Sequence, residues 1–298
     1  MTTSSKSGPK RTLVHLIQAA AIQGSLWTVR QLPLSWASAI GGFLFRTIGP
    51  FLKADKVARR NLKHAFPDWD QATIDATVRQ VWDNLGRGAG EFAHLGKIDV
   101  LAPNGPVDVV GLEHLIAARD QGAAIFLSAH MANWEMVSLV AYAHDCPLNN
   151  IYRFATNPYM DTYFRRVRGR FVNKLLPKGP AGFREAYAGM KRGERLGLLL
   201  DQKLNEGHPI PFFGRDAMTA IGPVELGLRL DVPILPVRIE RIAKCRFRVT
   251  IHPPLESPNS GDLKADTIAV ATEFTQRLEG WIRERPGEWF WVHKRWPN

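Results

Sequence analysis

From residue 108 onward, short apolar segments alternate with segments of helical periodicity, and this alternation limits the possible folds more than any other feature. Its first instance reads DVV-GLEHLIAARDQG-AAIFLSA, which predicts a strand, a helix and a second strand in direct succession. Strands that alternate with helices in this way form a mostly parallel sheet with helices packed on its faces. The sequence therefore predicts an α/β fold with a parallel or mixed sheet flanked by helices.

The same alternation continues to the C-terminus. Further strands are expected at 150–154, 174–176, 196–200, 233–240 and 247–252. Helices are expected at 53–66, 70–95, 158–171, 181–192, 223–230 and 262–285. No internal repeat or linker divides the chain, so we expect one α/β domain over residues 51–298 and a separate N-terminal extension over residues 1–50.

The N-terminal extension is almost free of charge. Residues 12–29 contain no Asp, Glu, Lys or Arg, and a second charge-free run covers 31–45. The first run is too polar for a good transmembrane helix, because it contains His15, Gln18 and Gln23. We predict two helices within residues 12–48, broken near Pro33, that lie in or dip into a membrane interface. The alternatives are a buried helical hairpin and a cleaved signal peptide, although no convincing cleavage site follows the basic cluster of Lys6, Lys10 and Arg11.

The overall charge indicates an anionic partner. The chain carries 39 Lys and Arg against 28 Asp and Glu, a formal net charge of +11 with a pI near 9.9. Such an excess fits an anionic membrane surface, an acidic carrier protein or nucleic acid. No recognisable nucleic-acid-binding module is present, so we expect no nucleic-acid partner. The two cysteines rule out a disulfide framework and suit a reduced, cytosol-facing protein.

Several common active-site motifs are missing, which narrows the possible chemistry. There is no G-x-S-x-G elbow, no Walker A loop and no H-E-x-x-H motif. The glycines of LGRGAGEF (86, 88 and 90) lie inside a helical pattern, so we expect them to let helices approach closely instead of binding a nucleotide. The nine histidines are scattered, and we expect neither a metal ion nor a cofactor.

The stretch AIFLSAHMANWEMV contains the strongest candidate site. An apolar strand ends near Ser128, and His130 and Glu135 follow. On one continuous helix these two side chains would point about 140° apart. If His130 instead lies in the turn before the helix, Glu135 can hydrogen-bond one ring nitrogen, and the histidine can act as a general base. Asn133 is expected to begin the helix and is also a candidate for substrate binding.

Other polar residues also lie where predicted strands end. Asp201 and Gln202 close the strand LGLLL, where Asp201 is expected to form a wall of the site or to cap a helix. Arg153 follows another strand. A helix downstream carries a group of arginines, of which one pair would face phosphate groups and the rest would form a solvated basic face: Arg165, Arg166, Arg168 and Arg170.

Four segments resemble one known family. H-M-A-N-W-E has the H-x-x-x-x-[DE] form of the glycerolipid-type acyltransferases, and with Asn-Trp inside it resembles the bacterial lipid A biosynthesis lauroyl/myristoyl acyltransferases. The similarity extends to IYRFATNPYMDTYFRRVRGRF, to GLLLDQKLNEGHPIPFFGRDAMTAIGP and to the C-terminal WFWVHKRW. These segments stand in the family's order and cover roughly residues 10–296.

The resemblance implies a glycerolipid-acyltransferase-like fold and a specific reaction. A fatty acyl chain would move from an acyl carrier protein thioester to a hydroxyl of a lipid A precursor, at the cytoplasmic face of the inner membrane, without a metal or cofactor. His130 would deprotonate the hydroxyl and Glu135 would orient the imidazole. The remaining candidates would bind substrate: Asn133, Arg153, Arg165, Arg168, Arg170, Asp201 and Gln202. Two alternatives stay open, namely another anionic lipid acceptor and a membrane-binding protein of this fold without catalysis.

Two further segments have two possible roles each. Phe212, Phe213 and Gly214 would shape an acyl channel or a tight turn. The tryptophans 289, 291 and 296 would either anchor the chain at the membrane interface or pack in the core.

Overall fold

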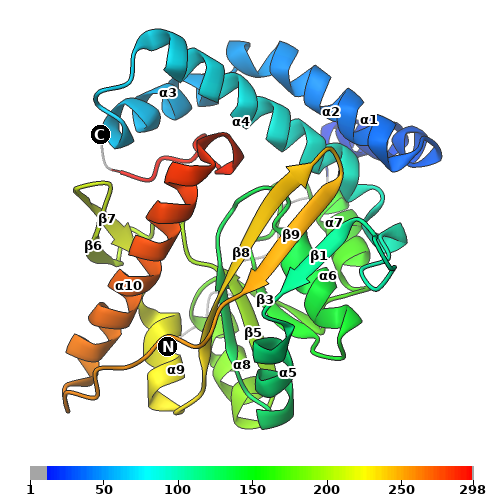
Figure 1. The fold of residues 1–298 in the computed structure, drawn as a ribbon. Helices are drawn as coiled ribbons and strands as arrows, with labels where there is room; N and C mark the ends of the chain where they lie inside the picture. The colour runs from blue at the N-terminus through cyan, green and yellow to red at the C-terminus, as the bar shows by residue number, and fades with distance from the viewer. Residues whose placement is uncertain (1–11, 297–298) are drawn as a thin grey trace.

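The computed structural model describes residues 12–296 and shows a seven-stranded sheet covered by helices (Figure 1). The strands follow the order β1-β9-β8-β2-β5-β3-β4. Their bounds are β1 Val107–Val110, β2 Ile125–Ser128, β3 Leu148–Tyr152, β4 Lys174–Pro177, β5 Arg195–Leu199, β8 Ile234–Ala243 and β9 Arg246–Ile251. All neighbouring pairs are parallel except β8 with β9. The predicted α/β class with a mostly parallel sheet is confirmed.

Helices cover both faces of the sheet and its carboxyl edge. Their bounds are α1 Leu13–Gln31, α2 Leu34–Ile48, α3 Lys53–Ala65, α4 Gln71–Phe92, α5 Leu112–Gln121, α6 Glu135–Ala143, α7 Pro158–Arg168, α8 Pro180–Lys191, α9 Gly222–Arg229 and α10 Leu263–Glu284. Short 3₁₀ turns are η1 Gly49–Phe51, η2 Leu95–Lys97 and η3 Pro286–Glu288. One apolar core joins the sheet to α8, α9 and α10, and a second joins it to α5 and α6. Strand β2 is buried along its whole length between β5 and β8.

The sequence pattern did not reveal a separate hairpin of β6 (His208–Phe212) and β7 (Arg215–Thr219), which lies beside α10 (Figure 1). Pro209 and Pro211 hide the strand pattern, because proline is rare inside strands of a larger sheet. Phe213 and Gly214 both have positive φ, 52° and 70°, as a two-residue hairpin turn requires. The tight turn expected at these positions is therefore confirmed.

The N-terminal pair α1 and α2 is separated at Pro33, as predicted. Helix α2 lies against α4 at very short backbone distance, since a Cβ on Gly86 would lie 2.1 Å from the Gly41 oxygen. A Cβ on Gly90 would similarly lie 2.2 Å from the Ala37 oxygen. The expected close approach of helices at the glycine-rich segment is confirmed at these two glycines.

The outer surface of α1, α2 and η1 is apolar. Large exposed side chains cluster there: Leu13, Val14, Leu16, Ile17, Ile22, Trp27, Trp36, Ile40, Phe43, Leu44, Phe45, Ile48 and Phe51. Ala19 is the one buried residue of α1, whereas α2 buries Ala37, Ser38 and Gly42, so the alternative of a buried hairpin is wrong for α1. Within residues 12–296 no helix has both the length and the apolar character needed to cross a membrane. The basic cluster of Lys6, Lys10 and Arg11 lies outside the described residues.

Candidate active site

His130 lies in the turn between β2 and α6, as the motif spacing predicted. The turn contains Ala132 at φ 47°, a left-handed conformation that costs a non-glycine residue about 1 kcal/mol. Its backbone N–H donates to the Glu288 oxygen at 2.9 Å, and the Phe290 N–H donates to the His130 oxygen at 3.0 Å. A short stretch of the C-terminal segment therefore pairs with the turn and holds it in place.

The partner of His130 is Asp201. The His130 ring Nδ1 lies 2.7 Å from Asp201 Oδ1, and the His130 backbone N–H donates to Oδ2 at 2.9 Å. Strand β5 is the direct neighbour of β2, so the residues that follow the two strands meet at the carboxyl edge of the sheet. The carboxylate at Nδ1 selects the tautomer with the proton on Nδ1 and leaves a lone pair on Nε2.

Asp201 is fully enclosed by its partners. Burial by itself would raise its pKa, but the charge of His130, the two His130 hydrogen bonds and the Trp289 indole N–H outweigh burial and lower the pKa of this carboxyl. The indole nitrogen lies 2.8 Å from Asp201 Oδ2. Asp201 therefore stays ionised beside the imidazole.

The second ring nitrogen of His130 points toward polar and aromatic neighbours. Its Nε2 lies 3.3 Å from the amide nitrogen of Gln202. Trp134 and Phe290 contact the ring, with centroids 5.1 and 5.6 Å away. The His130 side chain is about one-fifth exposed, and because Asp201 occupies Nδ1, Nε2 is the ring nitrogen left to accept a proton.

The predicted hydrogen bond between Glu135 and the His130 ring is wrong. Glu135 begins α6, and its carboxylate binds Arg168 of α7 through Nε at 3.0 Å and Nη2 at 2.5 Å. The Arg168 guanidinium also lies over the rings of Phe92, Tyr152 and Phe164. Burial disfavours this cation, but the Glu135 carboxylate raises the pKa of Arg168 above its ordinary value. A catalytic part for Glu135 stays a prediction, without direct contact to the imidazole.

The four clustered arginines separate in the structure. Arg168 is the member that turns inward, whereas Arg165, Arg166 and Arg170 are exposed. Arg165 lies over the Phe154 ring and Arg168 binds Glu135, and the binding of substrate phosphates by the arginines stays a prediction.

Asn133 is buried, and both ends of its side-chain amide are already bonded. Its Nδ2 donates to Glu91 at 2.9 Å, and its Oδ1 accepts from the Glu135 backbone N–H at 3.3 Å. The expectation that Asn133 begins the helix is wrong, because α6 starts at Glu135 with Trp134 at its N-cap, although the Asn133 side chain bonds the first helical N–H. Its part in substrate binding stays a prediction.

A row of cations lies along the carboxyl edge beyond His130. Lys203 follows β5, Arg153 follows β3 and Lys178 follows β4, and these strands are consecutive neighbours outward from β2. In the part of the chain that the structure describes, no ion pair joins any of the three to a carboxylate. We call Arg153, Lys178 and Lys203 the cationic rim. Of these three, the sequence pattern singled out Arg153 and missed both lysines.

Of the two roles expected for the C-terminal tryptophans, packing in the core is confirmed and the interfacial anchor is wrong. Trp289, Trp291 and Trp296 are at most 4% exposed. Trp289 bonds Asp201, and Trp291 stacks edge-on against Trp289 with centroids 4.6 Å apart. Residues 289–291 thus stabilise the His130–Asp201 pair, because Trp289 bonds Asp201 and Phe290 bonds the His130 backbone. The sequence did not predict these contacts, since the residues lie far apart along the chain.

No group of three or more His, Cys, Asp or Glu side chains in residues 12–296 could hold a metal ion.

Comparison with known proteins identifies the family. Residues 7–298 match the family described as bacterial lipid A biosynthesis acyltransferase. No curated protein matches the chain. The family match spans the turn, the Asp201 segment and the C-terminal tryptophans, so the resemblance carried by the four motifs is confirmed. The chain belongs to the bacterial lipid A biosynthesis acyltransferase family, and is an acyltransferase by that membership.

Proposed function

We propose that this protein transfers a fatty acyl chain from an acyl carrier protein thioester to a hydroxyl of a lipid A precursor. The observation that carries the proposal is the His130–Asp201 pair, with Nδ1 bound to the carboxylate and Nε2 accessible at the carboxyl edge of the sheet. Such a pair suits the removal of a proton from a hydroxyl nucleophile.

The reaction balances without an enzyme-bound acyl group. His130 Nε2 takes the proton of the acceptor hydroxyl while its oxygen forms a bond to the thioester carbon. The carbonyl oxygen carries negative charge in the tetrahedral intermediate. Collapse of that intermediate breaks the carbon–sulfur bond, and the protonated imidazole returns its proton to the departing sulfur. Asp201 stabilises the imidazolium throughout.

Gln202 is the nearest polar side chain to the reacting nitrogen. Its amide donates toward Nε2 at 3.3 Å, so the acceptor hydroxyl has to take its place. We propose that the displaced amide N–H donates to the developing oxyanion. A single such donor is worth about 3 kcal/mol of transition-state stabilisation.

The cationic rim supports the choice of substrates. Arg153, Lys178 and Lys203 lie at the edge where His130 lies, and the phosphates of a lipid A precursor and the phosphopantetheine of a carrier protein both present matching negative charge. The excess of 39 basic over 28 acidic residues favours an acidic carrier protein in the same way.

The apolar outer surface of α1, α2 and η1 supports association with the anionic inner membrane at its cytoplasmic face. Amphipathic helices with exposed aromatic and aliphatic side chains bury these groups at the lipid headgroup boundary. Flotation with anionic phospholipid vesicles tests this. A Phe43→Ser/Phe51→Ser variant should lose most vesicle binding, whereas a Leu101→Ser/Val110→Ser control should retain it. Equal binding by both variants would contradict the assignment.

The activity is tested with purified protein, an acylated carrier protein and a lipid A precursor, with products identified by mass spectrometry. An added ester-linked acyl chain on the precursor is the expected result. Acylation of a different anionic lipid under the same conditions would redirect the acceptor assignment. Absence of transfer to any acceptor would overturn the proposal.

A further inference from the structure

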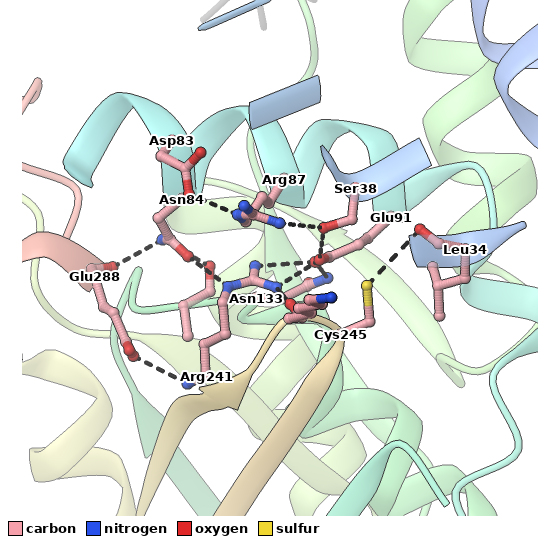
Figure 2. A network of polar contacts seen from close by, with 12 residues as sticks. Leu34, Ser38, Asp83, Asn84, Arg87, Glu91, Asn133, Arg241, Cys245 and Glu288 are labelled. Atoms are coloured by element: carbon pink, nitrogen blue, oxygen red, sulfur yellow. Dashed lines mark hydrogen bonds and ion pairs between the residues drawn. The ribbon is translucent and has the colours of Figure 1, made fainter. Parts of the chain in front are cut away.

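A second polar network lies behind the catalytic turn, and Glu91 of α4 is at its centre (Figure 2). The Glu91 carboxylate is fully buried. It accepts from Ser38 of α2 at 2.7 Å, from Asn133 of the turn at 2.9 Å, and from Arg241 of β8 at 2.5 and 3.1 Å. Glu91 therefore joins three separate elements of the fold to the H-M-A-N-W-E motif.

Arg241 extends this network to the other side of the turn. Its Nε donates to the Asn84 side-chain oxygen at 3.1 Å. The Asn84 amide in turn donates to the backbone oxygens of Ala132 and Glu288, at 3.1 and 3.2 Å. Figure 2 shows Asn84 between Glu288 and Arg241, with Glu91 on the far side of the guanidinium.

The network holds the part of the turn that is least stable by itself. Ala132 has the left-handed conformation that alanine disfavours, and Asn133 connects the turn to the first residue of α6. Glu91 and Asn84 thus fix the segment between His130 and Glu135 through contacts that are separate from those of Asp201. An error of about 1 Å in the position of a reacting group can lower a rate by about 100-fold.

We propose that Glu91 is a positioning residue for acyl transfer. It acts through Asn133, which carries its effect to the turn that presents His130 to Asp201. Arg241 neutralises Glu91, so the network is electrically balanced while it is buried. This proposal rests on the function proposed above, and one of its readouts is independent of that function.

The primary test is Glu91→Gln, compared with Glu194→Gln as a matched control. Glu194 also binds an asparagine amide and two cations, Asn149, Lys174 and Arg192, but it lies at the amino end of β5. Glu91→Gln should lower kcat by about 10- to 100-fold with KM within about 3-fold of wild type. Glu194→Gln should leave both constants near wild type. Equal kcat values for the two variants would contradict the proposal.

Glu91→Gln leaves Arg241 buried without its carboxylate, so a fold defect has to be separated from a positioning defect. The double variant Glu91→Gln/Arg241→Gln removes both charges. We expect its melting temperature to recover toward wild type while kcat stays at least about 10-fold low. In wild type Ser38 donates to Oε1 of Glu91 and Asn133 donates to Oε2, and glutamine replaces one of these two acceptor oxygens with an NH2 donor. If kcat recovers together with the melting temperature, Glu91 stabilises the fold and does not position His130.

The ring nitrogens of His130 give the readout that does not depend on acyl transfer. Histidine-selective ¹⁵N labelling, with His130 assigned through His130→Gln, should show the Nδ1–H tautomer alone in wild type and in Glu194→Gln. In Glu91→Gln a mixture of tautomers is expected, because the hydrogen bond to Asp201 loosens. A single Nδ1–H tautomer in Glu91→Gln, as in wild type, would overturn the proposal for Glu91. If the tautomers differ as expected but the wild-type protein transfers no acyl chain, only the proposed function is overturned.

Discussion

Among the buried carboxylates around the H-M-A-N-W-E turn are Asp201 and Glu135, and each is bound to a different cation. Asp201 binds the His130 ring and backbone at 2.7 and 2.9 Å. Glu135 binds the Arg168 guanidinium, which three aromatic rings surround. Asp201 follows the neighbouring strand β5 and lies 71 residues from His130 along the chain, whereas Glu135 is part of the motif.

The two carboxylates therefore have different roles. A carboxylate on an imidazole sets the tautomer and stabilises the cation that forms when the imidazole takes a proton. A carboxylate on a guanidinium stabilises a cation that is always present, and so fixes the position of α7 against α6. Asp201 should therefore act on the chemical step, and Glu135 on the arrangement of the site around it.

The largest expected loss of kcat follows from changes to the His130–Asp201 pair. Asp201→Asn should lower kcat by about 10³- to 10⁴-fold, since the amide favours the wrong histidine tautomer. His130→Ala should cost at least as much. The double variant should be no slower than His130→Ala alone, because the two residues act as one unit. Steady-state kinetics of the three variants check this, and additive losses would break the assignment of Asp201 to the imidazole.

Glu135→Gln should show a smaller kinetic loss together with a clear loss of stability. The change leaves Arg168 buried without its anion, which costs about 3–5 kcal/mol of unfolding free energy. We expect kcat to fall by about 100-fold while its dependence on pH keeps the wild-type shape. Denaturant unfolding and a pH–rate profile measure both quantities. A changed pH profile without a loss of stability would instead indicate that Glu135 acts on the imidazole.

The low pKa of Asp201 predicts how stability depends on pH. A carboxyl whose pKa is lowered by folding stabilises the protein above its unfolded pKa of 3.8 and loses that contribution as pH falls through the folded pKa. The stability difference between wild type and Asp201→Asn should therefore be constant from about pH 5 to 6 and shrink below about pH 4. Thermal unfolding at a series of pH values measures it. A difference that persists unchanged at the lowest pH would mean that Asp201 is not ionised in the folded protein.

The sequence predicts the long elements well because their patterns are local. A helix expected at 262–285 is observed as α10, Leu263–Glu284, and the turn that carries His130 follows from a strand that ends at Ser128. The partner of His130 could not be predicted from a local pattern, because it depends on which strand lies next to β2. Asp201 stood out as a polar residue at a strand end, but only the β2–β5 pairing brings it to the imidazole. Trp289 and Glu91 reach the turn through tertiary packing alone, and no spacing within the chain indicates either contact.

The smallest expected effect comes from changes to the cationic rim. These should alter KM, which reports substrate binding, whereas changes to Asp201 or Glu135 should alter kcat. Lys203→Gln should raise KM for the phosphorylated acceptor by about 10-fold with kcat unchanged, since one lost charge-assisted hydrogen bond is worth about 1.4 kcal/mol. Lys178→Gln, two strands further from β2, should have a weaker effect. Lys264→Gln on α10 is the control for the change in net charge. Added salt should reduce the difference between wild type and Lys203→Gln, because screening weakens the attraction that the lysine supplies. A fall in kcat at constant KM in Lys203→Gln would place this lysine with the His130–Asp201 pair instead of with substrate binding.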